Sequence, residues 1–72
     1  MKSYLVVIER TQTGYSAFVP DLPGCISTGP TRSAVEANMR EAIEFHIEGL
    51  RLEEGLPVPE PSSASAYIDV AA

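Results

Sequence analysis

One segment of this 72-residue chain is long enough for a substantial helix, and it constrains the fold more than any other feature. Between residues 31 and 54 a mostly apolar stripe recurs at helical spacing, and its members are Val35, Met39, Ala42, Ile43, His46 and Leu50. Thr31 is the expected N-cap, with Ser33 as the competitor. Gly55 follows, where helices commonly end in a left-handed residue. With one helix of this length, we expect the remaining regular structure of the chain to be strands.

The segments around this helix predict four short strands. They are rich in β-branched and aromatic residues and cover residues 3–9, 15–19, 25–28 and 64–70. A stiff proline-rich connector, residues 56–63, joins the helix to the last strand. The order β-β-β-α-β predicts an α+β fold in a single domain, residues 1–72, with the helix on one face of the sheet.

The first of these strands is apolar on both faces. Tyr4, Val6 and Ile8 point one way, and Leu5 and Val7 point the other. Because one helix covers only one face, the second face needs another cover. The chain has one cysteine and one histidine, so neither a disulfide nor a structural zinc braces this small fold. We therefore expect a second copy, forming a homodimer.

A dense loop connects the second and third predicted strands. Pro20 ends the second strand, because proline cannot donate to a ladder, and Asp21 is expected to bond its own backbone two residues on. A type II turn follows, with proline and glycine at its central positions, over Leu22, Pro23, Gly24 and Cys25. Gly29 then ends the third strand. Each of these residues has a conformational role.

The same loop supports an alternative hypothesis, a small cysteine-dependent hydrolase or nuclease remnant. Cys25 would be the nucleophile, His46 its base and Asp21 the orienting carboxylate. However, His46 lies within the apolar stripe, and Cys25 opens a strand where small hydrophobic residues are usual. No thiol-enzyme signature surrounds Cys25. We favour a packing cysteine in a non-enzymatic protein, with no catalytic residue, metal or cofactor.

The charge balance is acidic, with ten carboxylates against five basic side chains and a net charge of −5. This argues against direct nucleic-acid binding, which needs a basic surface, and favours a basic protein partner. The candidate partner-binding residues are Glu41, Glu44 and Glu48, on the helix side opposite the apolar stripe. The N-terminal apolar run is too short for a signal peptide or a membrane span. With its free cysteine, the chain is expected to be cytoplasmic.

Three stretches resemble the HicB family of antitoxin-like proteins. They are "YSAFVPDLPGCISTGPT" (residues 15–31), "EAIEFHIEGL" (41–50) and "EEGLPVPEP" (53–61), and the resemblance spans nearly the whole chain. It implies a partial ribonuclease-H-like fold without the catalytic carboxylates of true ribonucleases. In that fold the first three strands form an antiparallel meander, and the fourth pairs beside strand one.

The resemblance also implies a bacterial toxin–antitoxin function. Such a domain binds and blocks a small HicA-type toxin, a basic RNA-cleaving protein, and an acidic surface suits that partner. Many members carry a C-terminal DNA-binding module. The chain stops at Ala72, so we expect a stand-alone domain of the N-terminal type. A further alternative is a dimeric regulatory or ligand-binding module.

Overall fold

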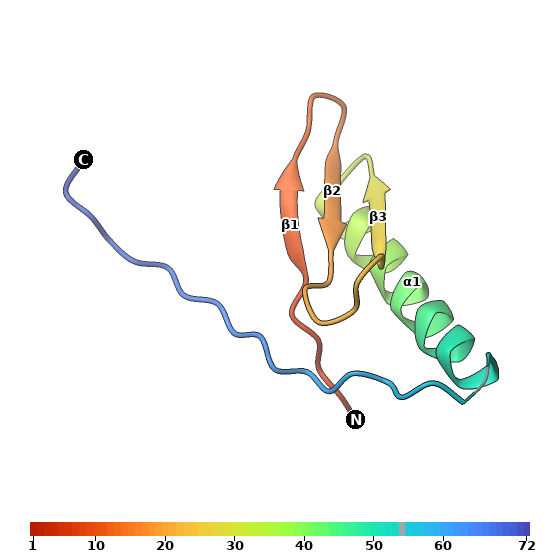
Figure 1. Ribbon diagram of the computed structural model, residues 1–72. Helices are drawn as coiled ribbons and strands as arrows, with labels where there is room; N and C mark the ends of the chain where they lie inside the picture. The colour runs from red at the N-terminus through yellow and green to blue at the C-terminus, as the bar shows by residue number, and fades with distance from the viewer. Residues whose placement is uncertain (54) are drawn as a thin grey trace.

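The computed structural model describes residues 1–53 and 55–72, and within them lie a three-stranded antiparallel sheet and one long helix (Figure 1). The elements follow the order β1 (Val7–Arg10), β2 (Tyr15–Phe18), β3 (Ile26–Gly29) and α1 (Arg32–Leu52). The sheet order is β1-β2-β3, and α1 packs against β3 and β2. The predicted α+β class and the antiparallel meander are confirmed.

Strand β1 is shorter than the apolar pattern predicts, because its partner ends early. Val7 pairs with Phe18, and Ile8 pairs with Ala17. Continuing this register toward the N-terminus would place Leu5 opposite Pro20, which has no N–H to give to a ladder. Residues 3–6 therefore lie outside the sheet.

The core lies between the sheet and α1. Its buried members are Ala17, Val19, Leu22, Cys25, Val35 and Met39. The partly buried side chains packed against them include Tyr4, Val6 and Ile8, one of the two apolar faces predicted for the first strand, together with Ile47. Leu22 is fully buried although it comes from a loop, so the core is closed partly by a connection and not only by regular elements.

The N-terminal end of α1 is capped by the residue that the sequence indicates, and its C-terminal end comes earlier than predicted. The Thr31 hydroxyl accepts a hydrogen bond from the Ala34 N–H at 3.1 Å, which makes Thr31 the N-cap in preference to Ser33. At the other end Glu53 is the C-cap, with an extended backbone, and its N–H donates to the Gly49 carbonyl at 2.9 Å. Gly55 follows with φ +60°, and the Leu56 N–H donates to the Leu50 carbonyl at 3.0 Å. Glu54, where the predicted helix ends, lies outside the described residues.

The predicted fourth strand, residues 64–70, is not a strand in this structure. No strand follows β3 in the described part of the chain, and these residues run away from the body as exposed, extended chain (Figure 1, blue). The radius of gyration is 14.0 Å, against about 11 Å for a compact chain of this length. The physical reason is that a strand needs a partner edge, and this segment has none beside it. We call residues 64–70 the tail.

Candidate protein-binding surfaces

The loop between β2 and β3 consists of two consecutive turns. The Leu22 N–H donates to the Val19 carbonyl, and the Cys25 N–H donates to the Leu22 carbonyl, each at 3.1 Å. Gly24 has φ +84°, the value that the third position of a type II turn requires and that side chains with a Cβ rarely adopt. The turns bring Leu22 under the sheet, so this loop is a structural unit of the core.

The Cys25 thiol is poorly placed for catalysis. Its residue is only 4% exposed, and burial raises the pKa of the thiol above its ordinary value. A raised pKa keeps the thiol protonated, whereas the thiolate is the nucleophilic form. His46, the base of the alternative hypothesis, is half-buried on α1. In residues 1–53 and 55–72, no hydrogen bond joins either side chain to Asp21.

The Asp21 carboxylate binds a distant segment and not its own turn. Its Oδ2 accepts the backbone N–H groups of Ser62 and Ser63 at 2.9 and 3.0 Å. Its Oδ1 accepts their hydroxyls at 3.1 and 2.8 Å. These hydrogen bonds, those from the backbone N–H groups of Ser63 and Ser62 first, lower the pKa of Asp21 to about 2. The expected local Asx turn is thus replaced by an anchor for the chain 41 residues later.

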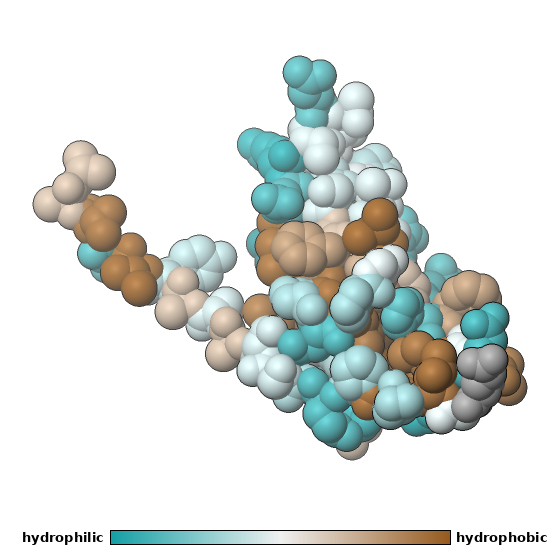
Figure 2. Space-filling view, viewed as in Figure 1, coloured by the Kyte–Doolittle hydropathy of each residue, from teal (hydrophilic) through white to brown (hydrophobic). Residues whose placement is uncertain are grey.

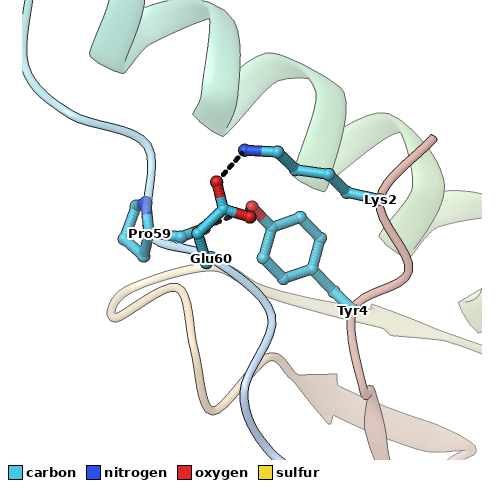
Figure 3. Close-up of polar contacts among 4 residues, drawn as sticks. All are labelled: Lys2, Tyr4, Pro59 and Glu60. Atoms are coloured by element: carbon cyan, nitrogen blue, oxygen red, sulfur yellow. Dashed lines mark hydrogen bonds and ion pairs between the residues drawn. The ribbon is translucent and has the colours of Figure 1, made fainter.

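Two further contacts hold the connector against the N-terminal segment (Figure 3). The Tyr4 hydroxyl donates to the Pro59 carbonyl at 2.6 Å, and the Lys2 ammonium pairs with the Glu60 carboxylate at 3.0 Å. Together with Asp21, these residues fix the course of residues 59–63, which we call the anchored connector. The tail therefore departs from a defined point near the N-terminal end of β1.

One side of α1 combines carboxylates with exposed apolar side chains. The three predicted partner-binding residues Glu41, Glu44 and Glu48 are all exposed. Phe45 is 82% exposed and Leu52 is 75% exposed, and helical geometry places all five within an arc of about 100°. We call these five residues the acidic helix face. The sequence analysis did not name Phe45 and Leu52 as partner-binding residues. Their helical spacing places them on the side opposite the apolar stripe, and this signal could have identified them.

A groove of about 1020 Å³ lies between the N-terminal segment with β1 and α1. Its apolar floor includes Val6, Ile8, Met39, Ile43 and Ile47. Four of the five basic residues of the chain, Lys2, Arg32, Arg40 and Arg51, line it. Arg32 forms an ion pair with Glu36 at 3.1 Å. We call this site the β1–α1 groove; its floor is apolar and its rim is charged, and Glu44 lies at once on this rim and on the acidic helix face.

The sheet surface opposite α1 is also apolar. Phe18 pairs with Val7 on one side and with Ile26 on the other, so the three form a row across the strands. Phe18 and Ile26 are exposed, at 39% and 69%. Figure 2 shows hydrophobic side chains gathered over the lower part of the strands. We call this row the outer sheet face.

Metal and membrane sites are not found in the described residues. No group of three or more His, Cys, Asp or Glu side chains there is arranged to hold a metal ion. No helix of residues 1–53 and 55–72 has the length and apolarity that crossing a bilayer requires.

Comparison with protein families gives a match over almost the full chain. The model of the HicB-like antitoxin of bacterial toxin–antitoxin systems matches residues 4–71. No solved structure matches significantly.

The relatives include proteins of about the same length as this chain and a longer one. A UPF0150 protein of Helicobacter pylori is 38% identical over 65 residues, which cover 90% of each chain. A UPF0150 protein of Thermoplasma acidophilum is 41% identical over 49 residues, covering 67% of this chain and 71% of the relative. An uncharacterized 14.9 kDa protein of Haemophilus phage HP1, from the rep-hol intergenic region, is 44% identical over 66 residues. That match covers 92% of this chain, which spans about half, 49%, of the phage protein.

Proposed function

Because the chain belongs to the HicB-like antitoxin family of bacterial toxin–antitoxin systems, we propose that it binds and blocks a small, basic, RNA-cleaving toxin of HicA type. The family match over residues 4–71 is the observation that carries this proposal. Family membership suggests a non-enzymatic role, and the protected Cys25 thiol agrees with such a role.

The acidic helix face is the proposed toxin-binding surface. Its carboxylates Glu41, Glu44 and Glu48 would attract a basic partner and speed the encounter. Phe45 and Leu52 would supply the apolar anchors that contribute most of the affinity in protein interfaces, where aromatic residues are enriched. The acidic helix face thus offers both charges that speed association and apolar side chains that supply affinity.

The proposal also covers the setting in which the protein acts. We propose a homodimer in the bacterial cytoplasm, since apolar side chains on the outer sheet face and in the tail need a cover and a free cysteine is usual in that compartment. We further propose that the fold is a partial ribonuclease-H-like one, completed by a fourth strand. The three antiparallel strands and the helix support this relation.

Matched substitutions test the assigned surface. Phe45→Ala is expected to weaken toxin binding by about tenfold or more, whereas Phe18→Ala, an exposed phenylalanine on the outer sheet face, leaves it nearly unchanged. Glu48→Lys is expected to slow association at low salt and lose its effect at high salt. Glu9→Lys, an exposed carboxylate on β1, serves as the charge control.

Calorimetry and association kinetics with a small basic toxin of HicA type provide the measurement. Equal losses in the Phe45 and Phe18 variants would show that the acidic helix face is not the binding surface. A wild-type chain that binds no such protein would remove the antitoxin proposal itself.

A further inference from the structure

The tail has the pattern of a strand but no partner of its own. Ala66, Ile68 and Val70 alternate with Ser65, Tyr67 and Asp69, the period of a strand with two distinct faces. Tyr67 is fully exposed, and Ile68 and Val70 are 80% and 77% exposed. Figure 2 shows the hydrophobic end of the tail standing away from the body. An extended segment with these side chains and no internal hydrogen bonds is stabilised only by pairing with an edge.

The sheet offers one open edge. The Thr11 N–H donates to the Gly14 carbonyl, and hydrogen-bonded pairs alternate along an antiparallel ladder. The backbone groups of Ile8 and Arg10 therefore point to the free side of β1. At the opposite edge, α1 packs against β3 and the Asn38 amide donates to the Thr28 carbonyl at 2.9 Å, so that edge is partly occupied.

The anchored connector directs the tail away from its own sheet. The four hydrogen bonds to Asp21 hold Ser62 and Ser63, and the chain beyond them continues outward (Figure 1). Pairing with its own β1 would require the chain to bend toward the sheet after Ser63, whereas it runs away from the sheet (Figure 1). In the sequence there, "ASA", only Ser65 is of a type that favours turns, and serine does so more weakly than glycine, proline, asparagine or aspartate.

We propose that the tail pairs as a fourth strand with the free edge of β1 in a second copy, and that two copies exchange their tails reciprocally. This inference rests on the homodimer of the proposed function and states how that dimer is built. Exchange of an identical element is a low-cost route to a dimer, and addition of a strand to an open edge is a common recognition mode.

The dimensions and the side chains agree with this pairing. Seven tail residues span about 23 Å, the same length as residues 4–10 of the receiving copy. With Ile68 and Val70 turned toward α1, they would cover the apolar floor of the β1–α1 groove, which includes Val6 and Ile8. Tyr67 would then lie on the opposite side, beside Val7, where it extends the outer sheet face.

Isotope-resolved crosslinking tests the exchange. The photoreactive residue benzoylphenylalanine replaces Ile68 in the full chain, which is mixed with wild-type chain labelled with ¹⁵N and irradiated. We expect covalent pairs of one labelled and one unlabelled chain, with the attachment sites in residues 3–10 or on the groove side of α1. Crosslinks found only within one chain, or between chains but outside the groove, would overturn the exchange.

Light scattering separates this inference from the dimer itself. Ile68→Glu would place a charge in the apolar groove, so its dimer dissociation constant should rise by at least about 30-fold. Ser65→Glu, on the alternate face of the same tail, should leave that constant nearly unchanged. A wild-type mass of one 7.7 kDa chain refutes the dimer. A dimer that tolerates Ile68→Glu refutes only the exchange.

Discussion

At Asp21, one carboxylate accepts hydrogen bonds from the backbone and the hydroxyl of both Ser62 and Ser63. A turn residue thereby joins the loop between β2 and β3 to the segment from which the tail leaves. The type II turn next to it could be predicted, because Pro23 and Gly24 have local conformational preferences. The partners of Asp21 could not be predicted, because two serines 41 and 42 residues away in the chain carry no local signal of the contact.

The lowered pKa of Asp21 predicts a specific acid sensitivity. The pKa falls from 3.8 to about 2 in the folded chain, so the ionised carboxylate stabilises the fold fully above about pH 4. That contribution is lost as the pH falls toward 2. In Asp21→Asn it is absent at every pH, so the difference in free energy of unfolding between wild type and variant should shrink from pH 5 to pH 2.

Urea unfolding at several pH values, with amide exchange of Ser62 and Ser63, provides the measurement. The variant should also exchange these two amides faster than the wild type at neutral pH. A constant stability difference across the pH range, with unchanged exchange, would contradict the anchor. Asp69→Asn, in the tail, is the matched control.

Cys25 is expected to act only through packing. Cys25→Ala should lower the free energy of unfolding by about 1 kcal/mol, because it empties part of a buried site, and it should leave toxin binding unchanged. A thiol reagent should react slowly with the native chain and rapidly in urea. If the thiol reacted as fast in the native chain as in urea, the result would instead support Cys25 as a nucleophile.

At the scale of elements, α1 depends on its cap. Thr31→Ala removes the hydroxyl that accepts from the Ala34 N–H, and a lost N-cap costs about 1 kcal/mol. Ser33→Ala should change the free energy of unfolding by less than about 0.5 kcal/mol, since Ser33 is exposed. Thermal unfolding followed by circular dichroism compares the two, and equal effects would count against Thr31 as the cap.

Element types could be predicted from the sequence more fully than element ends. The periodicity of Val35 and Met39 and the β-branched runs are local signals, and they predicted the helix and the first three strands. The start of β1 depends on where its partner β2 meets Pro20, which is a property of the pairing. The tail has a strand pattern, yet pattern alone does not say which edge receives it.

At the scale of the whole molecule, the charges are distributed unevenly. Four of the five basic residues line the β1–α1 groove, together with Glu36 and Glu44, while Glu41, Glu44 and Glu48 lie on the acidic helix face. The sequence indicated these carboxylates as candidate partner-binding residues, but the groove depends on how β1 stands relative to α1 and has no local signature. Under our proposals the two surfaces have separate roles, the groove for a second copy and the acidic helix face for the toxin.

The central claim is that this chain neutralises a toxin by binding it. The most direct test titrates the chain into an RNA-cleavage reaction of a small basic toxin of HicA type. We predict that cleavage falls in proportion to the complex formed and is abolished at saturation. Unchanged cleavage at saturating concentrations of folded chain would contradict the claim.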